Sequence, residues 1–313
     1  MKVRTEPAKL PSTAGGGRSA TRTTTRTTTR TTRTTTEQPP EAPLPSNASF
    51  AQRRPASSGM PAWATYVASK ARPAPGLVAL GKRLDDIERL AAAGVRVRCV
   101  FDLDNTLFDT RWRTLATARS FDAAHGTRHF AGLSDDELVS FIARTGAETA
   151  AALGLPDDVV TRFGAYWDEA FWRPENLVFD RPMDPSLSLI AEALKRGAEV
   201  VFLSGRVERY LLASGEQIGF REASIAQLVA AGVDTANVEL ILKPDTDTKT
   251  APFKACVLRR FDDEGEIGFF LTEGIRDLAH VREALPDTVC FRLACSFESG
   301  ECPPGVPTLP GRF

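Results

Sequence analysis

From residue 77 onward the chain shows two patterns of apolar residues, first the spacing of an amphipathic helix and then a series of short apolar segments. In residues 77–94 the apolar side chains recur every three or four positions, at Leu80, Leu84, Ile87 and Leu90. Such spacing places them on one face of a helix, and Gly94 is typical of a helix end. We therefore predict an amphipathic helix that ends near Gly94.

Five short apolar segments come after that helix and alternate with helix-like segments. They are residues 95–103, 199–204, 238–242, 267–272 and 288–293. Segments that are apolar on both faces are typical of strands buried in a parallel sheet, and their alternation with helices is typical of a doubly wound α/β fold. Ligands of such sheets bind beyond the carboxyl ends of the strands.

Residues 108–180 do not follow that alternation, because they contain helix-like segments and no clear strand. Ser134 and Glu137 have the spacing of a capping box, which predicts a helix through residues 138–154, and a second helix is expected after Pro156. We interpret the segment as an all-helical cap inserted after the first strand.

Residues 1–75 show neither the helical spacing of apolar residues nor short apolar segments. Residues 21–36 are a Thr/Arg repeat, and the surrounding Pro, Ser and Gly cannot bury enough apolar surface to offset chain entropy. The sequence thus predicts a disordered tail over residues 1–75. The core domain then comprises residues 76–107 and 181–313, on either side of the cap.

The tail is basic, because residues 1–60 hold ten Lys or Arg and three Glu, while the formal net charge of the whole chain is −1. We interpret it as a solvated spacer. Spaced arginines also attract polyanions, so the tail is the feature that favours nucleic acid as a partner. Organelle transit peptides are also rich in Arg and Thr, but they need an apolar face, which this tail lacks. Translation from Met60 would leave the tail out of the protein.

The remaining composition is that of an ordinary soluble protein, with 42% hydrophobic and 25% charged residues. The cysteines number five, and no apolar secretion segment begins the chain, which predicts a reduced, cytoplasmic protein. No apolar run approaches the length that crosses a bilayer, so no membrane association is expected. The sequence indicates no oligomeric state.

Polar side chains gather where three of the predicted strands end. They are Asp102 and Asp104 after the first strand, Ser204 and Gly205 after the second, and Glu273 and Asp277 after the fourth. Lys254 stands near the start of a predicted helix over residues 251–261. Because parallel strands end at one edge of the sheet, these groups should converge. Their chemistry is that of a phosphate and magnesium site.

Phosphoryl transfer needs a nucleophile, a proton for the leaving oxygen and positive charge around the phosphate. Asp102 can attack phosphorus and form an aspartyl-phosphate, and Asp104 can exchange protons with the leaving group and with water. Ser204, the amide after it and Lys254 can bind the phosphate. Mg²⁺ prefers carboxylates, carbonyls and waters, which suits Asp102, the backbone of Asp104 and an acid after the fourth strand.

At these positions the sequence resembles the haloacid dehalogenase (HAD) superfamily. DLDNT at residues 102–106 resembles its first motif, LSGR at residues 203–206 its second, and Lys254 its third. The resemblance covers residues 95–295, including the position of the cap.

The resemblance implies a Rossmann-like fold, with Asp102 as the nucleophile, Asp104 as the acid/base, and Ser204 and Lys254 as phosphate ligands. The dehalogenase branch of the family lacks the second aspartate. Asp104 therefore favours phosphoester chemistry.

Two motifs depart from the family pattern. Many relatives carry paired acids after the last catalytic strand, whereas here Glu273 is followed by Gly274, with Asp277 one turn later as a second candidate metal ligand. The third motif has three candidate lysines, Lys243, Lys249 and Lys254. We favour Lys254 because it falls just inside a helix start.

Several other side chains have a plain structural interpretation. Arg206 and Arg209 are expected to be solvated at the start of a surface helix, although either could contact substrate. His125 and His129 are expected at the surface of the cap rather than on a metal. The cap aromatics are expected to form its core, with stacking on a substrate as the alternative: Trp167, Phe171 and Trp172.

The sequence thus predicts a Mg²⁺-dependent phosphomonoester hydrolase that acts on a small phosphorylated metabolite through an aspartyl-phosphate intermediate. Two alternatives remain open. One is a catalytically degenerate HAD-fold protein that binds phosphate or a protein partner, suggested by Glu273 and Gly274. The other is a phosphatase of nucleic-acid ends, suggested by the basic tail.

Overall fold

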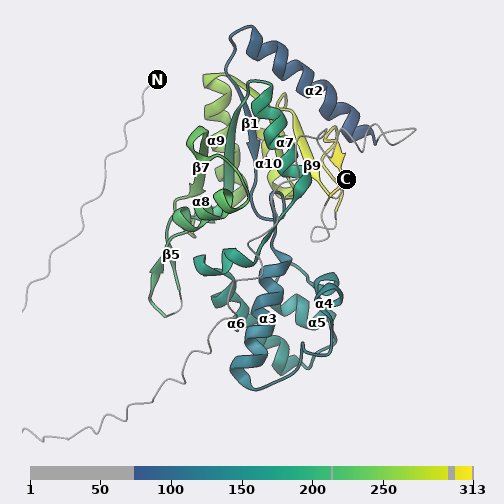
Figure 1. Ribbon diagram of the computed structural model, residues 1–313, viewed down its shortest axis with the longest axis vertical. Coiled ribbons are helices and arrows are strands. Elements are labelled where there is room, and N and C mark those ends of the chain that lie inside the picture. Colours follow the sequence, from purple (N-terminus) through teal and green to yellow (C-terminus); the bar gives the residue numbers. More distant parts are fainter. Residues whose placement is uncertain (1–73, 213, 295–299, 312–313) are drawn as a thin grey trace, which may run out of the picture. The chain divides into compact units, whose positions relative to one another are not determined.

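A six-stranded parallel sheet lies at the centre of the computed structural model, which describes residues 74–212, 214–294 and 300–311 (Figure 1). The strand order is β10-β9-β8-β1-β4-β7. The bounds are β1 Val97–Phe101, β4 Glu199–Val207, β7 Val238–Lys243, β8 Glu266–Thr272, β9 Cys290–Leu293 and β10 Thr308–Leu309. Every pairing in this sheet is parallel, which confirms the predicted fold class. The predicted tail lies outside the described residues as far as residue 73.

The five predicted strands are all present, and the sheet differs from the prediction in two ways. Strand β4 continues past Ser204 to Val207, with an irregular register against β7 between those two residues. Strand β10 was not predicted, because its two residues, Thr308 and Leu309, are too few to show a hydrophobic period.

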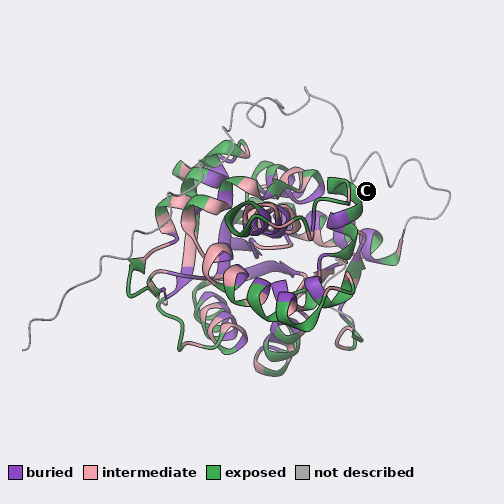
Figure 2. Cartoon of the chain, turned by 90° about the horizontal axis from the view of Figure 1, so that it is seen from below, coloured by how far each residue is buried: buried purple, intermediate pink, exposed green. Residues whose placement is uncertain are grey.

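Helices cover both faces of the sheet. On one face of the sheet, alternate strand residues pack in an apolar core with three helices, α2 (Pro75–Ala92), α7 (Asp184–Lys195) and α8 (Arg221–Ala230). The other residues face α9 (Thr250–Glu264) and α10 (Ile275–Ala284). Buried residues are concentrated on the strands and on the inner faces of the helices (Figure 2). The sheet is thus doubly wound, as predicted, and α2 ends before a left-handed Gly94.

A helical segment joins β1 to β4. Its elements are β2 (Phe108–Asp109), α3 (Arg111–His125), α4 (Asp135–Phe141), α5 (Gly146–Ala152), α6 (Asp157–Phe171), the 3-10 helix η2 (Pro174–Phe179) and β3 (Arg181–Pro182). We call residues 108–182 the helical insertion. It has an apolar core of its own, in which Trp167 and Phe171 are buried and Trp172 is partly buried. These aromatic side chains are therefore core residues, as expected.

Two details of the helical insertion differ from the prediction. The helix expected through residues 138–154 is two helices, α4 and α5, because Thr145 caps a new helix by accepting a hydrogen bond from the Glu148 amide. The capping box of Ser134 and Glu137 is present at the start of α4. Strands β2 and β3 also form an antiparallel ribbon where the chain enters and leaves the insertion.

A short hairpin of β5 (Tyr210–Leu211) and β6 (Gln217–Ile218) follows β4, and the 3-10 helix η3 (Thr235–Asn237) precedes β7. Tyr210 lies beside Trp172 of the helical insertion, with ring centroids 6.2 Å apart. Among the residues that the structure describes, no helix is both long and apolar enough to cross a membrane.

Candidate active site

The carboxyl ends of β1, β4 and β8 meet at one edge of the sheet, because β1 is hydrogen-bonded to β4 on one side and to β8 on the other. Asp102 follows β1, Ser204 and Arg206 lie in the last part of β4, and Thr272 ends β8. The predicted convergence of polar side chains is thus present in the fold.

Asp102 is buried, and its two carboxylate oxygens have different partners. Oδ2 accepts hydrogen bonds from Lys254 Nζ at 2.6 Å and from Thr272 Oγ1 at 2.9 Å. Oδ1 accepts one from the backbone amide of Leu103 at 2.8 Å. Burial raises the pKa of Asp102, and Lys254 acts in the opposite direction. The three donors fix the carboxylate in one orientation.

Lys254 is the candidate lysine that reaches this site. It lies in the first turns of α9, and its ammonium bridges Asp102 Oδ2 and Asp277 Oδ2 at 2.6 and 2.5 Å. Burial alone would lower the pKa of Lys254, but the charges of the two carboxylates outweigh it and raise the pKa. Lys243 instead donates to the Thr248 carbonyl at 2.8 Å, and Lys249 is the residue that precedes α9.

Glu273 is held by a threonine on the loop after β1. Thr106 Oγ1 donates to Glu273 Oε2 at 3.0 Å and accepts from the Glu273 amide at 3.1 Å. Burial raises the pKa of Glu273 to about 8, and the nearby charge of Asp102 adds to the shift. Glu273 and Asp102 also share the Thr272 hydroxyl, which lies 3.5 and 2.9 Å from their oxygens.

The predicted magnesium ligands do not all face one point. In residues 74–212, 214–294 and 300–311, no group of three or more His, Cys, Asp or Glu side chains is arranged as a metal site. Asp277 is the partner of Lys254, and the Asp104 side chain faces two arginines. Asp102 and Glu273 are the two predicted ligands whose carboxylates lie close to a shared hydroxyl.

The charges at this edge of the sheet nevertheless fit a hard cation. Three carboxylates, those of Asp102, Glu273 and Asp277, influence one another and one ammonium group, that of Lys254. A buried excess of negative charge is costly unless a cation compensates it. Oxygen ligands of this kind are what Mg²⁺ prefers. Asp102 and Glu273 would hold such an ion, together with the main-chain carbonyl of Asp104.

Asp104 has partners that the sequence did not indicate. Arg206 approaches its carboxylate with Nη2 at 2.7 Å and Nε at 3.2 Å, and Arg113 Nη2 lies 3.0 Å away. Burial opposes ionisation of Asp104, but the charges of Arg206 and Arg113 outweigh it and lower its pKa below the ordinary range. Asp104 is therefore held as a carboxylate.

The expectation that Arg206 is solvated was wrong. It lies in β4 rather than at a helix start, its side chain is fully buried, and it pairs with Asp104. Arg113 and Asp180, which complete the same cluster, were missed altogether. Their sequence signal was weak, because charged residues next to a predicted helix or turn are usually exposed.

Ser204 and Gly205 lie in the last part of β4. Ser204 is buried, and its Oγ accepts a hydrogen bond from the Arg206 amide at 3.1 Å. At Gly205 a Cβ atom would lie 2.9 Å from Thr250 Cγ2, so only glycine lets β4 approach the start of α9 so closely. The amino end of a helix favours anions, which agrees with the predicted phosphate role of this region.

The remaining candidates have structural partners. His125 is exposed, as expected, although its Nδ1 bonds the Phe121 carbonyl at 2.9 Å and its ring lies beside those of Phe121 and Tyr166. His129 also lies near the Phe121 ring.

Comparison with known proteins adds fold likeness only. No family model matches the sequence, and no curated protein matches it. Solved structures that resemble the chain include Protein Tyrosine Kinase A of Mycobacterium tuberculosis (16% identity, TM-score 0.44, covering 68% of this chain and 93% of that one). A second is a haloacid dehalogenase-like family hydrolase from Streptococcus pneumoniae (12%, 0.39, 64% and 85%). A third is CbbY from Rhodobacter sphaeroides in complex with phosphate (18%, 0.39, 69% and 93%).

Proposed function

We propose that this chain is a HAD-type phosphomonoester hydrolase that acts on a small phosphorylated metabolite. The observation that carries the proposal is the orientation of Asp102, whose Oδ2 is held by Lys254 and Thr272. Oδ1 has a single backbone donor, the Leu103 amide, and is the oxygen that we assign to the attack. Asp104, two residues later, supplies a second carboxylate for proton transfer.

The reaction would take two steps. In the first, Asp102 Oδ1 attacks phosphorus, the bond from phosphorus to the ester oxygen breaks, and the leaving oxygen takes the proton that Asp104 accepted from water in the preceding turnover. In the second, water attacks the aspartyl-phosphate and Asp104 accepts its proton. Phosphate leaves and Asp102 is restored. The ionised state in which Arg206 and Arg113 hold Asp104 is the state that the second step requires.

Positive charge and hydrogen-bond donors for the phosphate come from three places. Lys254 offers its ammonium group, Ser204 its hydroxyl, and the start of α9 the free amides of a helix end. A magnesium ion bound by Asp102 and Glu273 would add charge neutralisation at the phosphate oxygens. The helical insertion would cover the site, which favours small substrates.

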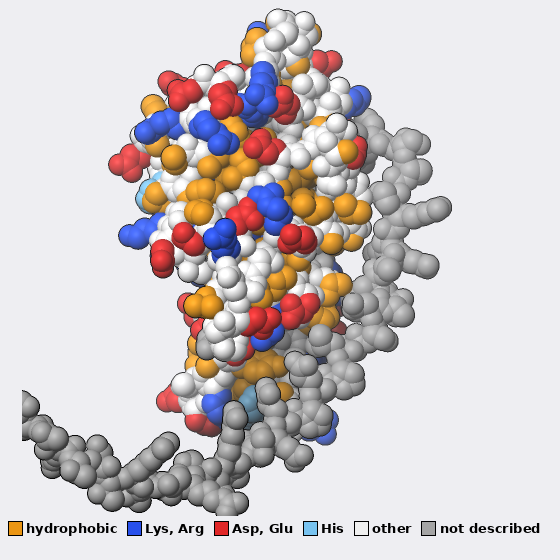
Figure 3. Space-filling view, turned by 90° about the vertical axis from the view of Figure 1, so that its left-hand side faces the viewer, with side chains coloured by type: hydrophobic (Ala, Val, Ile, Leu, Met, Phe, Trp, Pro, Cys, Tyr) orange, Lys and Arg blue, Asp and Glu red, His pale blue; other side chains and the backbone are white. Residues whose placement is uncertain are grey.

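A second candidate function is phosphate binding without turnover. It is favoured by the ion pairs that already engage the two central carboxylates, namely Lys254 on Asp102 and Arg206 on Asp104. A role on nucleic-acid ends rests only on the tail, which lies outside the described residues. On the face shown in Figure 3, Lys and Arg side chains are interspersed with Asp and Glu, so that face offers no continuous basic patch. The cytoplasmic location stays a prediction from the cysteines.

Phosphate release by the full chain tests the proposal. A panel of phosphorylated metabolites is assayed with Mg²⁺ and with EDTA, for the wild type, for Asp102→Asn, and for Asp263→Asn on the exposed side of α9 as a matched control. We expect turnover that needs Mg²⁺ and is abolished by Asp102→Asn alone. A folded wild-type protein that binds phosphate but releases none from any ester would favour the second candidate.

A further inference from the structure

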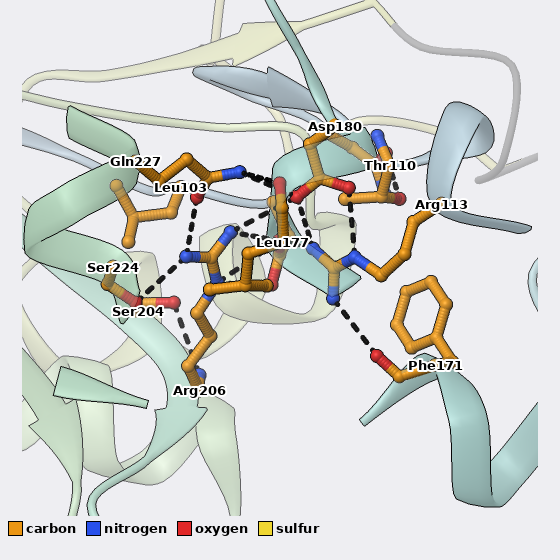
Figure 4. Close-up of polar contacts among 12 residues, drawn as sticks. Leu103, Thr110, Arg113, Phe171, Leu177, Asp180, Ser204, Arg206, Ser224 and Gln227 are labelled. Atoms are coloured by element: carbon orange, nitrogen blue, oxygen red, sulfur yellow. Dashed lines mark hydrogen bonds and ion pairs between the residues drawn. The ribbon is translucent and has the colours of Figure 1, made fainter. Parts of the chain in front are cut away.

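Asp104 belongs to a cluster of four charged side chains. Its members are Asp104, Arg113, Asp180 and Arg206, two acids and two bases. In Figure 4 the guanidinium groups of Arg206 and Arg113 point toward each other from opposite sides, and the Asp180 carboxylate lies beside that of Arg113. Both arginine side chains and that of Asp180 are 0% exposed, whereas the Asp104 side chain is 25% exposed, so the cluster is buried except on the side of Asp104.

Arg206 has used all of its hydrogen-bond donors. Nε and Nη2 point to Asp104, Nη2 also reaches Asp180 Oδ2 at 3.5 Å, and Nη1 donates to Ser224 Oγ at 2.9 Å and Gln227 Oε1 at 2.8 Å. A guanidinium group has five N–H donors, and these five contacts account for them. Arg206 is therefore built to hold Asp104, and it has no donor left for a substrate.

Arg113 is anchored in a similar way from the helical insertion. Nε donates to Asp180 Oδ1 at 2.9 Å, Nη2 pairs with Asp180 Oδ2 and with Asp104, and Nη1 lies 3.4 Å from the Phe171 carbonyl. The guanidinium also lies 4.3 Å from the centre of the Phe171 ring. Gln227 Nε2 completes the cluster by donating to Asp180 Oδ2 at 2.9 Å.

The cluster joins the helical insertion to the core. Arg113 lies in the first turn of α3, four residues after β2 ends at Asp109, and Asp180 directly precedes β3, so they flank the ribbon where the chain enters and leaves the insertion. Arg206 comes from the central sheet. The placement of the insertion is thereby coupled to the orientation of Asp104.

We propose that Arg206 and Arg113 are positioning residues that fix the Asp104 carboxylate beside Asp102, and that Asp180 fixes the two arginines. This inference rests on the proposed hydrolase function. Neither arginine touches the reacting atoms; each acts through Asp104. Loss of either guanidinium would leave Asp104 free to turn away from the leaving group and the attacking water, which slows turnover without weakening substrate binding.

A double-mutant cycle tests the inference. Steady-state kinetics are measured on the full chain for Arg206→Lys, Asp104→Asn and the double variant. We expect Arg206→Lys to lower kcat about 10²-fold with KM nearly unchanged, within the range of general acid–base catalysis. In the Asp104→Asn background the same change should cost little more, because a residue that acts through Asp104 has nothing left to position.

Arg98→Lys is the matched control. Arg98 is a fully buried arginine on β1 that bonds Glu264 and the Phe261 carbonyl, far along the strand from Asp102. We expect its kcat to stay near that of the wild type, which would show that losing a buried guanidinium is not enough to impair turnover. An Arg206 loss that persists in full in the Asp104→Asn background, or that raises KM, would overturn the positioning role and make Arg206 a substrate ligand.

The cycle also separates this inference from the proposed function. A wild type that hydrolyses no phosphate ester contradicts the proposed function. In that case the double-mutant cycle is evaluated from the thermal unfolding midpoints of the same four proteins. Midpoint shifts of Arg206→Lys and Asp104→Asn that simply add would overturn the coupling between the two side chains. Shifts that do not add would support it.

Discussion

At the scale of single residues, the site depends on two threonine hydroxyls to which the sequence analysis gave no role. Thr272 and Thr106 place Asp102 and Glu273, and both threonines are completely buried. Their hydroxyls could not be told from ordinary strand or turn threonines in the sequence, because β-branched residues are common in strands.

Replacing Thr272 by valine should lower kcat about tenfold, since a hydrogen bond to a charged group contributes about 1.5–3 kcal/mol and part of it orients Asp102. KM should change little. Steady-state kinetics on the best ester of the panel measure both values. Thr288→Val, a buried threonine before β9, is the control. An unchanged kcat would show that Lys254 and the Leu103 amide orient Asp102 by themselves.

Glu273 should make stability depend on pH in EDTA. Because its pKa of about 8 in the folded protein lies above the ordinary value, the folded state binds the proton more tightly than the unfolded state. This stabilisation is present at low pH and is lost as the pH rises through 8. Urea unfolding from pH 5 to 8.5 should show a fall that Glu273→Gln reduces by about 2 kcal/mol.

The exposed Glu283 on α10 provides the control for that experiment, because Glu283→Gln removes a carboxyl from the same region without touching the site. Its pH profile should follow that of the wild type. Equal slopes for the wild type and Glu273→Gln would mean that Glu273 is as solvated in the folded chain as in the unfolded one.

At the scale of elements, the end of β4 is tightly packed against the start of α9. Gly205→Ala would put a Cβ 2.9 Å from Thr250 Cγ2. We expect a loss of about 1–3 kcal/mol in unfolding free energy, the usual cost of overpacking, measured by urea denaturation. Thr250→Ser, which removes that methyl group, should recover part of the loss.

Gly81→Ala is the matched control for the same measurement. Gly81 lies inside α2, and a Cβ there would meet nothing within 4 Å. The change should stabilise the protein by about 0.5–1 kcal/mol, because alanine loses less backbone entropy than glycine in a helix. Equal effects at the two glycines would contradict the close approach of β4 and α9.

Elements with a strong period were predictable, and elements without one were not. The amphipathic α2 and the five apolar strands follow from local patterns of hydrophobic residues. The break between α4 and α5 depends on Thr145, whose capping role is one of several that threonine can adopt. Strand β10 exists only because β9 offers it a partner.

At the scale of the whole molecule, a phosphatase of small metabolites should not need the basic residues 1–59 for its activity. We expect deletion of residues 1–59 to leave kcat and KM for a small phosphate ester unchanged at low and high salt. The control substrate is a short 3′-phosphorylated oligonucleotide assayed on both proteins. Turnover of the oligonucleotide that falls on deletion, most strongly at low salt, would instead support a nucleic-acid end as the substrate.

The sequence by itself determined the parallel α/β fold and the pair of Asp102 and Asp104, because both follow from local rules: hydrophobic periods, and side chains two residues apart at a strand end. The tertiary structure selected Lys254 among three lysines and assembled the cluster around Asp104. Arg206 and Asp104 are 102 positions apart, and Arg113 and Asp180 are 67 apart. A charged residue looks the same in sequence whether it meets water or a buried partner, so only folding distinguishes the two.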